Sequence, residues 1–101
     1  MATNVFTVVA KLYPKPGRED EIQAILIQQA AAVLKAEKDC LAYRAHRSAT
    51  QPTVFLFYEQ YRTKEAFDVH RTAAHLAAFR ERHKGLLDNP TEVEIYDSLT
   101  D

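Results

Sequence analysis

The segment that decides the fold is residues 53–61, TVFLFYEQY, the most strand-like stretch of this 101-residue chain. Side chains alternate between the two faces of a strand, so Phe55, Phe57 and Tyr61 fall on one face. The opposite face is also apolar, with Val54, Leu56 and Tyr58. A strand with one face in water alternates apolar with polar residues. This segment is therefore expected to be covered on both faces.

The flanking segments predict three more strands and three helices. β-branched, aromatic or alternating patterns indicate strands at residues 5–14, 40–49 and 91–99. Residues 18–37 repeat apolar side chains at helical spacing, which indicates a helix of about five turns. Two shorter helices are expected at residues 64–71 and 75–84. The order βαββαβ, with the second helix divided, predicts an α+β, ferredoxin-like fold whose four-stranded antiparallel sheet carries its helices on one face.

Length and composition favour one domain spanning residues 1–101. Hydrophobic residues make up 47% of the chain, enough for a packed core. Thirteen basic and fourteen acidic side chains give a net charge of −1, which argues against a nucleic-acid partner or an anionic membrane. No apolar run reaches the roughly 20 residues that a membrane helix needs, and the single cysteine, Cys40, fits a reducing compartment. A cytoplasmic protein is expected.

The second face of the predicted sheet needs a cover that the helices cannot provide. Residues 5–14 are apolar on both faces, with Val5, Val9 and Tyr13 opposite Phe6 and Val8. Large exposed apolar surfaces are rare on monomers. A homodimer that packs sheet against sheet is the simplest expectation, and an exposed apolar sheet is the alternative.

His70 and His75 are the first candidates for chemistry. Five residues on a continuous helix separate two side chains by roughly 140°, so the helix must break if both serve one site. His70 shares a face with Ala66 and Phe67 and suits a general base, or a buried histidine bonded to a carbonyl. If Thr72 caps the following helix, His75 meets its positive end and is favoured neutral, as a hydrogen-bonding group or a junction residue. Two histidines without an apparent cysteine or acidic cluster give too few ligands, so no metal site is expected.

Residues of the neighbouring strands could form a pocket. Glu59 among aromatic residues is costly to bury without a partner, so it is expected to pair with an arginine or histidine or to border a cavity. Tyr61, on the same face, would direct its hydroxyl inward. Tyr43, Phe55 and Phe57 would complete a wall suited to a flat aromatic ring, or belong simply to the core.

Four segments together resemble the antibiotic biosynthesis monooxygenase domain family: PKPGREDEI at 14–22, DCLAY at 39–43, FLFYEQY at 55–61 and HRTAAHLAAF at 70–79. The resemblance covers roughly residues 5–99 and implies a dimeric α+β barrel. It is weak for the reaction, because the same fold resembles quinol monooxygenases, a phospho-autoinducer isomerase, haem-degrading enzymes and non-catalytic stress-response barrels.

The chain also departs from these relatives. The absence of tryptophan counts against the haem-degrading branch. Ala30 lies near the level where the isomerase-like relatives place a histidine, and Ala74 stands where the family often has proline. Both isomerase chemistry and haem degradation are therefore less favoured.

The resemblance implies a monooxygenase without metal or flavin that oxidises a small phenol or quinol with O₂. His70 would be the base and His75 or Tyr61 the hydrogen-bond donor to the anion. The substrate-binding residues would be Tyr43, Phe55, Phe57 and Glu59. The alternatives are a non-catalytic dimeric barrel that binds a small ligand, and an isomerase of a small metabolite. The isomerase would require cationic groups in the pocket, for which Arg71 and Arg80 are candidates.

Overall fold

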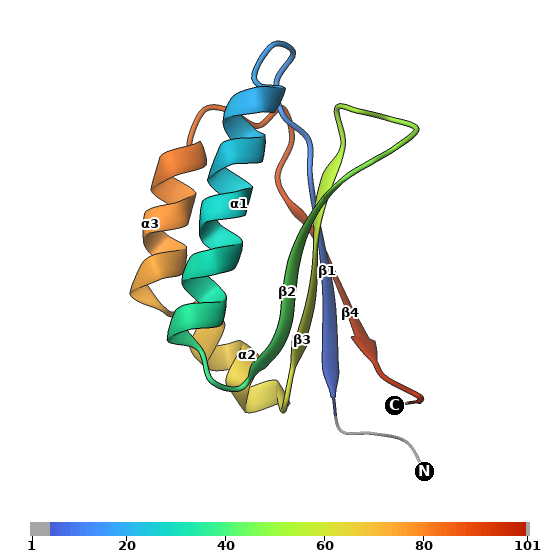
Figure 1. Ribbon diagram of the computed structural model, residues 1–101, viewed down its shortest axis with the longest axis vertical. Helices are drawn as coiled ribbons and strands as arrows, with labels where there is room; N and C mark the ends of the chain where they lie inside the picture. Colours follow the sequence, from blue (N-terminus) through green and yellow to red (C-terminus); the bar gives the residue numbers. More distant parts are fainter. Residues whose placement is uncertain (1–4, 101) are drawn as a thin grey trace.

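The computed structural model describes residues 5–100. Its elements are β1 (Phe6–Leu12), α1 (Glu19–Ala36), β2 (Cys40–Arg47), β3 (Phe55–Tyr61), α2 (Lys64–Arg71), α3 (Ala74–His83) and β4 (Glu92–Asp97). The helices lie on one face of the sheet (Figure 1). The expected ferredoxin-like βαββαβ fold is confirmed. Within the described residues, no helix has both the length and the apolar character needed to cross a bilayer.

The sheet has the order β2-β3-β1-β4 with every neighbouring pair antiparallel. β3 therefore lies inside the sheet, between β2 and β1. Ala10 pairs with Phe57 and Val8 with Glu59, and all four side chains are buried under the helices. Glu59 is thus a carboxyl group on the core side of a central strand.

The apolar stripe predicted on α1 packs against this face of the sheet. Ile22, Leu26 and Val33 are almost fully buried, and Gln29 is buried with them. Leu34, which the helical spacing placed on the same stripe, is half exposed. The stripe is therefore narrower at the C-terminal end of α1 than the sequence suggested.

A β-bulge at the start of β2 changes which side chains face the core. Pairing with β3 shifts between Cys40 and Ala42, so Leu41 is an extra residue in the ladder. Cys40 and Tyr43 are buried, whereas Leu41 is 42% exposed. The expectation that Leu41 shares a face with Tyr43 is wrong. Because of the extra residue, Cys40 and Tyr43 face the core while Leu41 faces away from it.

The second helix breaks between His70 and His75, as was expected if both histidines serve one site. Thr63 caps α2 by accepting a hydrogen bond from the backbone N–H of Ala66. Thr72 was expected to cap α3 but does not do so. Its hydroxyl donates to carbonyls of the last turn of α2. Ala73 is the N-cap residue of α3. The break brings the rings of His70 and His75 to 6.2 Å between centroids.

Candidate functional site

A cavity of about 780 Å³ lies between the helix-side face of the sheet and helices α2 and α3. It exists because the helices leave the β4 side of that face open. Val93 and Ile95 pair with Ala10 and Val8 and face the same way, yet they are 54% and 53% exposed. The remaining apolar wall comes from β1, β3, α2 and α3, including Leu12, Phe57, Phe67, Leu76 and Phe79.

The structure brings some of the predicted site residues to this cavity and not others. Those that border the cavity are Tyr43, Phe57, Glu59 and His70. Those that do not border it are Phe55, Tyr61 and His75. Phe55 instead lies at a smaller hollow beneath the guanidinium of Arg47, 5.0 Å from the ring centroid.

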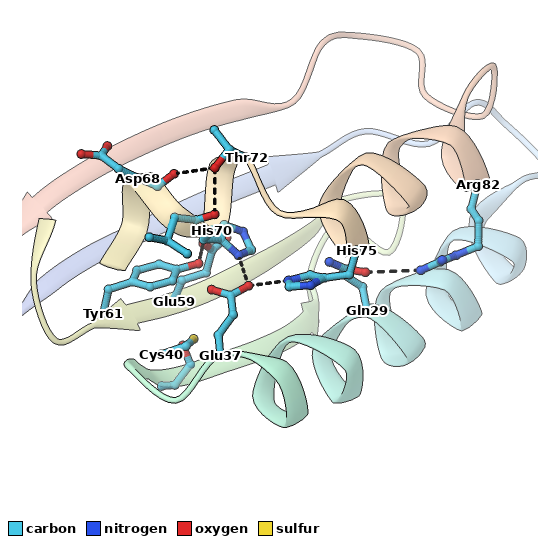
Figure 2. Close-up of polar contacts among 12 residues, drawn as sticks. Gln29, Glu37, Cys40, Glu59, Tyr61, Asp68, His70, Thr72, His75 and Arg82 are labelled. Carbon is cyan, nitrogen blue, oxygen red and sulfur yellow. Dashed lines mark hydrogen bonds and ion pairs between the residues drawn. The ribbon is translucent and has the colours of Figure 1, made fainter. Parts of the chain in front are cut away.

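Glu37 joins the two histidines into one cluster. Its Oε2 accepts hydrogen bonds from Nδ1 of His70 at 2.7 Å and from Nε2 of His75 at 2.5 Å (Figure 2). The side chains of His70 and Glu37 are only 4% and 9% exposed, and that of His75 is 24% exposed. The three residues come from α2, the C-cap of α1 and α3.

This arrangement fixes the hydrogen positions on His70. A carboxylate oxygen can only accept, so Nδ1 carries the hydrogen and neutral His70 keeps a lone pair on Nε2. Within residues 5–100, the His70 ring makes one hydrogen bond, from Nδ1 to Glu37. Burial lowers the pKa of His70, and the carboxylate of Glu37 opposes that shift. The neutral, proton-accepting form is therefore the one that the site favours near pH 7.

Rings on three sides hold this imidazole in place. Its centroid lies 5.4 Å from Tyr43, 5.3 Å from Tyr61 and 6.3 Å from Phe67. Tyr43 in turn packs on Phe57 at 4.5 Å. Packing and the Glu37 hydrogen bond together restrain the orientation of His70, which is the requirement for a positioned base.

Glu37 was not among the residues that the sequence suggested. It lies 33 positions from His70, and the expectation that too few ligand groups surround the histidines overlooked it. One signal was present: Glu37 follows α1 at its negative end, where an acidic side chain is disfavoured. An acid in such a position needs a partner elsewhere in the fold.

Two alternatives were expected for Glu59, a pairing with an arginine or histidine or a place at the border of a cavity. Glu59 borders the cavity, and its hydrogen-bond partner is Tyr61. The hydroxyl of Tyr61 donates to Oε1 of Glu59 at 2.7 Å (Figure 2), and Arg62 pairs with Asp39. Burial, with a smaller contribution from the charge of Glu37, raises the pKa of Glu59 to about 7. The hydrogen bond from Tyr61 acts in the opposite direction and lowers this pKa. Burial also raises the pKa of Tyr61, so its hydroxyl stays protonated and donates. Glu59 is a second titratable group on the cavity wall.

Basic side chains border the mouth of the cavity. They are Arg71, Arg80, His83 and Lys84. Arg71 also pairs with Asp68 at 3.4 Å and lies over the ring of Phe67. Asp88 borders the same cavity, so the rim is mixed with a cationic surplus.

Sequence comparison identifies the relatives of this chain. Residues 5–82 match the antibiotic biosynthesis monooxygenase family. The chain is 30% identical over 95 residues to the uncharacterized protein sll1783 of Synechocystis; the match covers 94% of this chain and 64% of that protein. It is also 30% identical over 97 residues to a Mycobacterium tuberculosis protein named "Putative monooxygenase Rv0793", covering 96% of this chain and 94% of that protein. The chain thus spans just under two thirds of the cyanobacterial relative.

Solved structures support the same assignment. The structure of Rv0793 superposes with a TM-score of 0.86 at 27% identity, covering 96% of this chain and 97% of that one. A Nitrosomonas europaea protein of the same family name superposes with a TM-score of 0.90, covering 98% and 94% of the two chains. Its 19% identity shows the fold alone. The chain belongs to the antibiotic biosynthesis monooxygenase family.

Proposed function

We propose that this protein is a monooxygenase that uses no metal or flavin of its own and oxidises a small phenol or quinol with O₂. The observation that carries the proposal is the buried Glu37–His70 pair beside an apolar cavity. The carboxylate orients the imidazole through Nδ1, so Nε2 of His70 is the ring nitrogen left to accept a proton, and His70 borders the cavity. A base and a dry, apolar chamber are the parts that such a reaction requires of the protein.

In the proposed reaction, Nε2 of His70 removes the phenolic proton. The resulting anion gives an electron to O₂, and the two radicals combine within the cavity. For a hydroquinone the balance is one hydroquinone and one O₂ giving one hydroxyquinone and one water. The substrate supplies all four electrons that reduce O₂, one oxygen atom enters the ring, and the other leaves as water.

The remaining candidates have supporting positions in this scheme. Tyr43 and Phe57 form the aromatic wall against which a flat ring packs. Tyr61 and His75 lie behind the wall and act through Glu59 and Glu37, as positioning residues. Phe55 supports Arg47 at the smaller hollow and is left outside the substrate site.

Oxygen uptake by chelator-treated protein tests the proposal. With a panel of hydroquinones and polyphenols, corrected for autoxidation, we expect saturable uptake with at least one member of the panel. Labelled O₂ should place one labelled atom in the product and one in water. Heat-denatured protein is the control for catalysis by trace metal. Saturable ligand binding without uptake would contradict the proposal and favour the non-catalytic, ligand-binding barrel.

The basic rim favours a second candidate, an isomerase of a small anionic metabolite. Arg71, Arg80 and Lys84 would bind a carboxylate or phosphate at the cavity mouth. In that reaction His70 would move a proton between two carbon atoms, and no O₂ would be consumed. Exchange of substrate hydrogen for solvent deuterium, without oxygen uptake, would distinguish this candidate from the oxygenase.

We also propose that the chain forms a homodimer through the outer face of the sheet. Val9, Leu56 and Tyr58 form an apolar centre on this face, where Val9 pairs with Tyr58. Lys11 and Glu94, 3.6 Å apart, lie at the side of this centre. The mixture resembles an interface with an apolar core and a polar rim.

Sedimentation analysis of wild type and Tyr58→Asp tests the dimer. We expect a dimer for wild type, and a dissociation constant raised roughly 30-fold or more for the variant, because a buried unpaired charge costs about 2 kcal/mol or more. Val69→Asp, at an exposed position of α2, is the matched control and should stay dimeric. A monomeric wild type, or equal weakening in both variants, would contradict this interface.

A further inference from the structure

The Glu37–His70–His75 cluster has the composition of a metal site. Its three possible ligand atoms, one carboxylate oxygen and two imidazole nitrogens, lie within 4.8 Å of one another. They come from three elements that converge at one end of the helical layer (Figure 2). We propose that this cluster is a binding site for one divalent first-row transition ion, such as Zn²⁺, held by two histidines and one carboxylate.

The charge of the cluster supports a cation. The side chain of Glu37 is 9% exposed, and its ion-pair partners among residues 5–100 are the two histidines alone. It also follows the C-terminal end of α1, whose dipole disfavours a negative charge and favours a positive one. An ion at this point would balance a buried carboxylate that neutral imidazoles leave uncompensated.

The donor set selects the kind of ion. Two imidazole nitrogens and one carboxylate oxygen suit Zn²⁺ or Fe²⁺, and too few oxygens are present for Ca²⁺ or Mg²⁺. Zinc holds such ligands at about 2.0–2.2 Å, which separates neighbouring ligand atoms by roughly 3.3 Å in a tetrahedron. The present separations from the carboxylate oxygen, 2.5 and 2.7 Å, need to open by less than an ångström. His75, the most exposed of the three, has room to make that adjustment.

Metal binding would change the hydrogen positions on His70. Coordination through Nδ1 displaces the hydrogen to Nε2, because a neutral imidazole carries one hydrogen on its two nitrogens. Nε2, the ring nitrogen proposed to accept the substrate proton, would then donate and no longer accept. We therefore expect the metal-loaded protein to lose oxygen uptake, and this expectation rests on the proposed function. The proposal that the cluster binds a metal ion does not depend on that function.

Calorimetric titration of tag-free, chelator-treated protein with Zn²⁺ tests the site. We expect one ion per chain, a higher melting temperature on loading, and no binding of Mg²⁺ under the same conditions. Titration with Co²⁺ should give the visible spectrum of a four- or five-coordinate ion. At a protein concentration of about 0.1 mM, binding with a micromolar dissociation constant would be detected. Absence of Zn²⁺ binding at this concentration would overturn the proposal.

Variants distinguish this site from other histidines. Glu37→Gln and His75→Ala should each weaken binding roughly tenfold or more, since each removes a ligand. His46→Ala removes an exposed histidine on β2 and should leave binding unchanged. Melting curves without metal show whether each variant is folded. Equal affinity in wild type and Glu37→Gln, or a loss in His46→Ala, would contradict the assignment whether or not the protein consumes oxygen.

Discussion

Replacement of His70 by glutamine is expected to lower kcat for oxygen uptake by about 10²–10⁴-fold, the usual contribution of a positioned general base. The glutamine amide can still donate a hydrogen bond to Glu37, so the buried carboxylate keeps a partner. It offers no group that accepts a proton near neutral pH. Steady-state oxygen uptake with the best substrate of the panel measures the loss, and KM should change much less than kcat.

Two further variants give this result its meaning. His46→Ala, an exposed histidine outside the cavity, should keep the wild-type rate. His75→Ala keeps His70 and its Glu37 contact and should lose much less activity than His70→Gln, because His75 does not border the cavity. A folded His70→Gln protein with the wild-type rate would contradict the assignment. Glu59 would then be the first candidate for the base, since it borders the same cavity.

The fold could be predicted because its patterns are local. The alternation in β3 and the stripe on α1 depend on residues two, three or four positions apart, and the structure bears out both except at Leu34. The bulge at Leu41 could not be predicted, because it depends on how β2 pairs with β3, and that pairing leaves no periodic signal in the strand itself. The prediction that Thr72 caps α3 was wrong for a related reason. Thr72 had two helix ends within reach, and its hydroxyl completed the earlier one.

The candidate site could be predicted only in part. The spacing of His70 and His75 predicted a break between them if both serve one site, and the break is present. Glu37 was missed because tertiary packing alone brings the end of α1 to the two histidines. For Glu59 the sequence left open a pairing with an arginine or histidine or a place at the border of a cavity, and Glu59 borders the cavity without such a pairing. The fold instead uses the hydroxyl of Tyr61 and a raised pKa, which need no second charge.

Replacement of Glu59 by glutamine is expected to stabilise the protein at pH 8 by about 3 kcal/mol relative to wild type, with little change below pH 4.5. The pKa of Glu59 rises from 4.5 in the unfolded chain to about 7 in the folded one. Between these values the folded chain holds a proton that the unfolded chain has lost. Wild-type stability therefore falls as the pH rises through this window, and levels off above it. Glutamine is neutral throughout and still accepts from Tyr61.

Denaturant unfolding of both proteins at several values between pH 4.5 and pH 8 measures the effect. The difference between the two free energies of unfolding isolates Glu59, because every other titrating group is common to both chains. Glu65→Gln, at an exposed position of α2, is the matched control and should keep the wild-type slope. A difference that stays constant across the window would mean that Glu59 is ionised in the folded protein well below pH 7. The carboxyl group would then be excluded as a proton donor near neutral pH, and its carboxylate would be a weaker base than one with a pKa near 7.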